Sequence, residues 1–141
     1  MFRHNRGYSF IWWGVFFALV LGPLLTMGIE LGRYARAAGE AQKAVDLAAL
    51  AAAREVDVIA FRDEGIIQFL PSAYAVATSY AGANSDFLSR YGIGVNIESI
   101  SLDPETLEVR LVGTANVSAL FPAWLPEIVI RKEGRAQARF R

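Results

Sequence analysis

Few residues of this sequence are of the kinds that carry out chemistry, and their spacing does not bring them together. The chain has no cysteine and one histidine, His4. Disulfides, thiolate metal sites and cysteine nucleophiles are therefore excluded, and a Ser-His-Asp triad would need a residue of the N-terminal tail. Gly92 and Gly94 precede a strand pattern and not a helix, so they do not form a phosphate-binding loop.

Three neighbouring carboxylates, Asp103, Glu105 and Glu108, suggest a cation site. They surround the turn signal Asp-Pro-Glu-Thr and continue onto a strand with alternating faces. A hard cation needs more converging oxygen ligands than this arrangement offers. We therefore interpret the three as turn and strand residues, and the sequence predicts no catalytic residue, no metal ligand, no cofactor and no small-molecule substrate.

The composition limits the size of the protein and the class of its partners. A length of 141 residues leaves room for one domain and no second large one. Fourteen basic and fourteen acidic residues give a net charge of zero, which argues against nucleic-acid binding. The hydrophobic fraction is 54% and is unevenly distributed along the chain, so its location matters more than its size.

Residues 8–29 carry no charged side chain and are predicted to form a transmembrane helix. At about 1.5 Å per residue the segment reaches about 33 Å, enough to cross a hydrocarbon core of about 30 Å. Proline is tolerated within membrane helices, and a kink is expected at Pro23. The residues predicted to anchor the chain in the membrane are Tyr8, Trp12, Trp13, Phe16, Phe17 and Pro23.

Two alternatives to a retained anchor are a cleaved signal peptide and a buried helix. No small-x-small cleavage site follows Leu25, which disfavours the signal peptide. The rest of the chain is too short to wrap a uniformly apolar helix. Arginines lie on both sides of the segment, so charge alone does not settle its orientation.

The helix is expected to continue to about Glu55 as an alanine-rich amphipathic segment, because alanine is the best helix former. Small residues at three- and four-residue spacing form a stripe suited to close packing against a sheet or another helix. Glu40 and Lys43 can form a local ion pair. Asp46 has two interpretations: a partner for a basic group on another helix, or a solvated charge beside Lys43.

The second half of the chain predicts a shorter helix and a three-stranded antiparallel sheet. The helix begins at Pro71-Ser72 and ends at Gly82 and Asn84. Hydrophobic residues then recur with period two, with a phase shift that predicts a bulge near Ser99. The predicted strands cover residues 95–102, 107–117 and 128–140, and small residues form part of their inner face: Gly113, Ala115, Gly134, Ala136 and Ala138. The fold class is therefore α+β with a pilin-like layout.

The connection before the last strand is unusually apolar. It contains four large apolar residues where polar ones are usual: Leu120, Phe121, Trp124 and Leu125. They either cap the core or form an exposed contact patch for a partner or the membrane surface. The last strand is basic, and its residues either form a solvated face or attract an anionic partner.

Two stretches of the long helix resemble the TadE/TadG-like family, which serves assembly of tight-adherence (Tad, or Flp) pili. They are Gly28-Ile-Glu-Leu-Gly-Arg-Tyr-Ala-Arg36 and Gln42-Lys-Ala-Val-Asp-Leu-Ala-Ala-Leu-Ala-Ala-Ala-Arg54. The resemblance is specific over about residues 6–55 and looser beyond. The residues that match or stand at motif positions are Glu30, Gly32, Arg33, Asp46 and Leu50. Glu30 replaces the commoner aspartate, and Leu47 occupies an alanine position.

The resemblance implies a single-pass protein of the cell membrane with an extracytoplasmic, periplasmic C-terminal part. It divides the chain into a tail (1–7), a transmembrane helix (8–29) and a pilin-like domain (30–141). Prepilins have a glutamate five residues after the cleavage-site glycine, whereas Trp12 stands five residues after Gly7. The resemblance therefore implies an uncleaved accessory protein of the TadG type, without the large extra domain that such relatives often carry.

Three hypotheses of function compete. The leading one is an accessory protein of Tad-type pilus assembly, which acts through protein–protein and helix–helix contacts with the membrane and with other pilus-assembly or pilin-like subunits. The second is a minor pilin, processed after Gly7 and incorporated in the filament. The third, a membrane-anchored enzyme, lacks a convergent acid/base set in the sequence.

Overall fold

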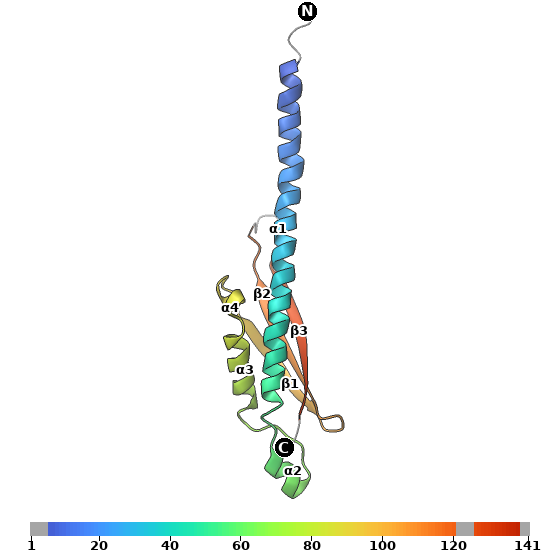
Figure 1. The fold of residues 1–141 in the computed structure, drawn as a ribbon, viewed down its shortest axis with the longest axis vertical. Helices are drawn as coiled ribbons and strands as arrows, with labels where there is room; N and C mark the ends of the chain where they lie inside the picture. The colour runs from blue at the N-terminus through green and yellow to red at the C-terminus, as the bar shows by residue number, and fades with distance from the viewer. Residues whose placement is uncertain (1–5, 121–125, 139–141) are drawn as a thin grey trace, which may run out of the picture. The chain divides into compact units, whose positions relative to one another are not determined.

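The computed structural model of the chain describes residues 6–120 and 126–138, with side chains from residue 9 onward. The chain divides into two compact units, Met1–Ala35 and Arg36–Arg141. Helix α1 (Arg6–Ala52) contributes to both units. The other elements all belong to the second unit (Figure 1): α2 (Val58–Glu64), α3 (Ala73–Ala83), α4 (Asp86–Ser89), β1 (Val95–Asp103), β2 (Glu108–Val117) and β3 (Ile128–Gln137). The predicted α+β class is confirmed.

In the first unit, α1 is helical without a break through Pro23. The hydroxyl of Thr26 donates a hydrogen bond of 2.9 Å to the carbonyl oxygen of Gly22, one turn earlier. Pro23 has no N–H to donate to the carbonyl oxygen of Leu19, a loss that membrane helices tolerate.

The second unit contains a three-stranded antiparallel meander in the order β1-β2-β3. The β1–β2 register shifts between Ile97 and Ser99, which confirms the bulge predicted near Ser99. Because the bulge adds one residue, the inward phase passes from Ile97 to Ile100, which pairs with the buried Leu111.

Two glycines of the sheet allow α1 to approach it at backbone distance. A Cβ atom on Gly134 would lie 2.6 Å from the carbonyl oxygen of Val45, and one on Gly113 would lie 2.8 Å from a Val45 methyl group. Val45 is fully buried at this contact. The alanines of α1 around it are buried too: Ala37, Ala41, Ala44, Ala48, Ala49, Ala51 and Ala52. The small inner face predicted for β2 and β3 thus receives the alanine-rich part of α1.

Helix α3 follows the predicted boundaries and ends at Asn84, which is its C-cap. It buries Ala73, Ala77 and Ala81, and the hydroxyl of Tyr74 donates a hydrogen bond of 2.8 Å to the carbonyl oxygen of Ile97 in β1. Figure 1 shows α3 beside the C-terminal part of α1. The three-residue spacing from Ala77 would place Tyr80 on the packed face, but Tyr80 is 47% exposed because Ala81 occupies the inward position one residue later.

Residues 56–70 form a lobe around α2 (Val58–Glu64). The Asp57 carboxylate caps the helix by accepting hydrogen bonds of 3.0 Å from the N–H groups of Ile59 and Ala60. Gly65 ends the helix with a φ of 71°, a left-handed conformation that glycine adopts at low cost. A short bridge between Val56 and Phe69 closes the lobe.

The close contact between α1 and β3 generates a test of the packing. Gly134→Ala places a methyl group against the Val45 backbone, so we expect a loss of about 1–3 kcal/mol in the free energy of unfolding. Thermal denaturation in detergent micelles, followed by circular dichroism, measures the loss. Gly82→Ala is the matched control, because its Cβ would meet no atom within 4 Å. Equal stability of the two variants would contradict the packing.

Candidate interaction sites

The apolar part of α1 in the first unit is exposed. Its most apolar stretch is 0% buried, and α1 is a helix long and apolar enough to cross a membrane. Trp12 is 71% exposed, and Trp13 forms an aromatic cluster with Phe16 and Phe17, with ring centroids 5.8–6.0 Å apart. The side chain of Tyr8 lies outside the described residues. So much contiguous apolar surface is typical of a segment that lipid or protein covers.

The motif residue Glu30 is the point at which charge returns after the apolar segment. Its side chain is 1% exposed and accepts a hydrogen bond of 3.1 Å from the Arg33 guanidinium. A Cβ atom on the motif glycine, Gly32, would meet nothing within 4 Å.

In the second unit, a cation–π contact links α4 to α1. The Arg36 guanidinium carbon lies 4.1 Å from the ring centroid of Phe87, and the Phe87 ring in turn contacts Tyr91 at 5.0 Å between centroids. A cation over a ring face contributes about 0.5–1 kcal/mol at an exposed site. The contact links the short helix to α1.

Asp46 is exposed on α1, as expected of a solvated helix charge, and it has a local partner other than Lys43. Its carboxylate accepts a hydrogen bond of 2.9 Å from the amide of Gln42, one turn earlier in α1. The same amide donates to the backbone carbonyl of Glu133 in β3, also at 2.9 Å. Lys43 pairs instead with Glu40, at 3.3 Å, as predicted. Asp46 therefore orients the side chain that links α1 to the outer strand.

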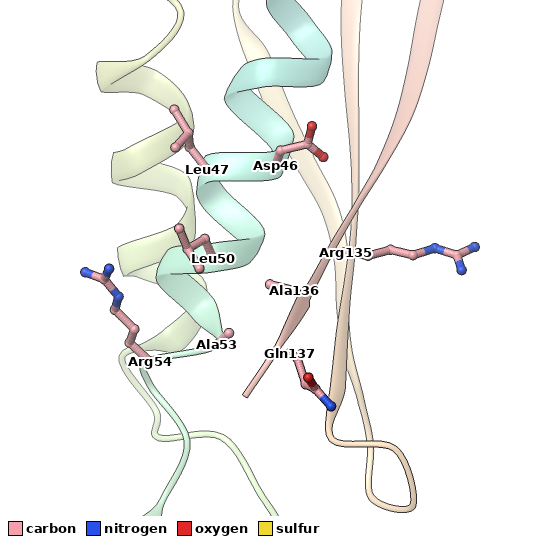
Figure 2. Close-up of a pocket in the computed structure, with 8 residues that line it drawn as sticks. All are labelled: Asp46, Leu47, Leu50, Ala53, Arg54, Arg135, Ala136 and Gln137. Carbon is pink, nitrogen blue, oxygen red and sulfur yellow. The ribbon is translucent and has the colours of Figure 1, made fainter. Parts of the chain in front are cut away.

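An open groove of about 900 Å³ lies between the C-terminal part of α1 and the end of β3 (Figure 2). The residues that line it are Asp46, Leu47, Leu50, Ala53, Arg54, Arg135, Ala136 and Gln137. Leu50 is 46% exposed, although it stands at a position of the family motif. Sequence reasoning missed this groove. The feature of the sequence that could have indicated it is the pair Leu47 and Leu50, which lie on the face of α1 that the alanine stripe does not occupy.

A second apolar surface covers the lobe around α2. Five large apolar side chains are exposed there within fifteen residues: Val58, Ile59, Phe61, Ile66 and Leu70. The capped helix and the backbone bridge hold them in one arrangement. This surface was not predicted, because no single hydrophobic period runs through residues 56–70.

The patch predicted around Leu120 falls mostly outside the described residues. Leu120 is 54% exposed, whereas Phe121, Trp124 and Leu125 lie outside the described ranges, as does Phe140 of the last predicted strand. The choice between a core cap and a contact patch stays a prediction.

The acidic residues between β1 and β2 form a turn, as interpreted from the sequence. The Asp103 carboxylate accepts a hydrogen bond of 2.9 Å from the Glu105 N–H. Hydrogen bonds from the Thr106 side chain and from the Glu105 backbone hold the pKa of Asp103 below its ordinary value of 3.8. Among residues 6–120 and 126–138, no group of three or more metal-ligating side chains is found.

These features define a class of protein: a single long helix with a bare apolar segment, joined to a small α+β unit whose distinctive surfaces suit contacts with other molecules. The family comparison is more specific. Residues 7–55 match the family described as putative Flp pilus-assembly TadE/G-like, so the resemblance seen in the sequence is confirmed over this segment. No curated protein and no solved structure matches the chain significantly.

The turn at Asp103 generates a pH test. Its depressed pKa means that the ionised carboxylate stabilises the fold above about pH 4, and that this stabilisation is lost as the pH falls through the lower folded-state pKa. We expect Asp103→Ala to lower the Tm at pH 7 and the difference from the unmodified protein to shrink below about pH 3. Glu105→Ala, which keeps the backbone donor, is the control. A difference that stays constant with pH would contradict this account of the turn.

Proposed function

We propose that this protein is a membrane-anchored accessory protein of Tad/Flp-type pilus assembly, of the TadG type. The observation that carries the proposal is that the family match and helix α1 have nearly the same first and last residues. The family match covers residues 7–55, and α1 covers Arg6–Ala52. Among the described residues, the pilus-assembly likeness therefore resides in the one helix that is apolar enough to span a bilayer.

The proposed mode of action is contact with other pilus components and with the membrane. The sequence offers no cysteine, and its one histidine is in the N-terminal tail. The described residues present instead an open groove and exposed apolar side chains on α1 and on the lobe around α2. Exposed apolar patches of this kind are typical of protein–protein and membrane contact surfaces.

In the proposed topology, residues 1–7 are a cytoplasmic tail, residues 8–29 cross the membrane and residues 30–141 form an extracytoplasmic domain. The charge-free run 8–29 and the return of charge at Glu30 and Arg33 support these boundaries. The orientation rests on the family resemblance, since basic residues flank the span on both sides.

We further propose that the chain is not cleaved after Gly7. Trp12 occupies the position at which prepilins carry a glutamate. A carboxylate inside a bilayer is costly and is retained where it has a function. Trp12 supplies no carboxylate to pair with the amine that cleavage would release, which supports an accessory role over incorporation in the filament.

Processing is tested by the intact mass of the protein expressed in a host that has its prepilin peptidase. We expect a mass that retains residues 1–7. A second preparation from a host without the peptidase is the control and should have the same mass. A mature N-terminus at Tyr8, found only where the peptidase is present, would overturn the uncleaved accessory protein in favour of the processed minor pilin.

Orientation is tested by cysteine labelling, for which the cysteine-free chain is a clean background. In intact spheroplasts, a membrane-impermeant maleimide should label Ser79→Cys, on the exposed side of α3, and should not label Asn5→Cys. Lysis should expose both thiols. Labelling of Asn5→Cys alone in intact spheroplasts would reverse the topology.

A further inference from the structure

The second unit has one end at which α1 enters it, and β3 begins at the same end. The Gln42 amide donates to the carbonyl oxygen of Glu133. Further along both elements, Ala53 and Gln137 line one groove, so α1 and β3 run in the same direction. The start of β3 therefore lies beside the first residue of the unit, Arg36. We call this the entry end of the second unit.

The start of β3 extends at least as far toward the entry end as Arg36 does. Counted back from the Gln42–Glu133 hydrogen bond, Val129 lies four strand residues away, about 13 Å. Arg36 lies six helical residues away, about 9 Å. Val129 and the end of β2, where Val117 pairs with Ile128, are therefore among the outermost parts of this end.

Large apolar and aromatic side chains are exposed at the entry end. The Phe87 ring lies 4.1 Å from the Arg36 guanidinium carbon and contacts the Tyr91 ring, which places Tyr91 there too. Figure 1 shows α4 toward this end of the second unit and α2 at the other end. The side chains that are at least 37% exposed at the entry end are Tyr91, Leu120, Ile128 and Val129.

We infer that the entry end of the second unit lies in the headgroup layer of the bilayer that holds α1. The inference rests on the proposed function, because it requires residues 8–29 to cross the membrane. Six residues, 30–35, separate the charge-free run from Arg36, and a helix advances about 10 Å from residue 29 to residue 36.

The short separation identifies lipid as the occupant of this surface. Headgroups add about 5–7 Å to each side of the hydrocarbon core, so most of the 10 Å is already headgroup layer. The few ångströms that remain are less than the diameter of an α-helix, about 10 Å. A partner protein does not fit between the entry end and the bilayer, whereas lipid headgroups reach it.

The exposed side chains suit an apolar contact with this layer. Tyrosine is enriched at membrane–water interfaces, because its ring is apolar and its hydroxyl is polar. Among the described residues of the entry end, the exposed basic residues Arg36 and Arg90 are balanced by the exposed acidic residues Asp86 and Glu127. The contact therefore depends on buried apolar area and not on attraction to anionic lipid.

The lobe around α2 supplies an internal comparison. It exposes apolar side chains as well, but it follows Ala52, and α1 advances about 24 Å from Arg36 to Ala52. The lobe is therefore out of reach of headgroups that touch the entry end. Lipid contact at the entry end and its absence at the lobe together distinguish a specific surface from general apolar exposure.

The test uses single-cysteine variants of the full chain, labelled with a nitrobenzoxadiazole fluorophore in phosphatidylcholine nanodiscs. Val129→Cys reports the entry end, and Ile59→Cys on the lobe is its matched control, since these side chains are 62% and 67% exposed. Lipid with a nitroxide on its headgroup should quench the Val129 label at least threefold more than the control. Aqueous iodide should quench it at least threefold less. Equal iodide quenching would overturn the inference, because it would mean proximity without contact.

A second pair of variants tests the contribution of the apolar side chains. The reporter is a label on Ser89→Cys, in α4 at the entry end. We expect Val129→Ser to raise iodide quenching of this label at least twofold and Ile59→Ser to leave it unchanged. Circular dichroism confirms that each variant is folded. Equal effects of the two substitutions would contradict a contact made by the entry end.

Lipid charge tests the apolar character of the contact. When a third of the phosphatidylcholine is exchanged for phosphatidylglycerol, we expect the protection of the Val129 label from iodide to change less than twofold. A rise of threefold or more would overturn the apolar contact in favour of electrostatic attraction.

Co-elution of the unmodified chain with the nanodisc reports the anchor separately. Loss of co-elution would overturn the proposed membrane anchor and the inference with it. Co-elution together with equal iodide quenching at Val129 and Ile59 would overturn the inference alone.

Discussion

The contact of Val45 with Gly113 and Gly134 is the constraint on which the second unit depends. A Cβ atom on either glycine would come closer to Val45 than atoms tolerate. Alanine buries little apolar area, so a helix with an alanine face gains stability by close approach and dense packing. The two glycines permit that approach, and they place α1 over β2 and β3. The position of α1 in turn creates the groove beside the β3 edge.

Helix α1 has two compositions that serve two environments. Around Trp12 and Trp13 its side chains are large and exposed, as in a lipid-facing segment. Around Val45 its side chains are small and buried. The family match ends three residues after the helix does. The pilus-assembly likeness thus lies in the apolar segment and in the alanine-rich packing stripe of α1.

The spacing of hydrophobic and small residues was sufficient to predict the elements in which a single repeat runs from end to end. The alanine stripe, the bulge near Ser99 and the small inner face of the sheet are all confirmed, because each follows from a local steric rule. The lobe around α2 escaped prediction. Its structure depends on the Asp57 cap, on Gly65 and on a bridge between residues thirteen apart in the sequence.

The candidate sites were harder to predict than the fold for a physical reason. Asp46 was weighed against Lys43 and external partners, whereas its hydrogen bond is to Gln42, whose second bond reaches a strand ninety-one residues away. The groove likewise joins residues of α1 to the end of β3. The Asp46–Gln42 bond follows four-residue helix spacing, but the Gln42–Glu133 bond and the groove are not encoded in local spacing. Both depend on where the two glycines allow α1 to pack on the sheet.

The most direct test of this account is an NMR measurement on the full chain in detergent micelles. Nuclear Overhauser effects between the Val45 methyl protons and the α protons of Gly113 and Gly134 report the contact itself. The account predicts strong cross-peaks to both glycines together with the cross-strand peaks of the meander. Intact cross-strand peaks without any Val45–glycine contact would contradict it.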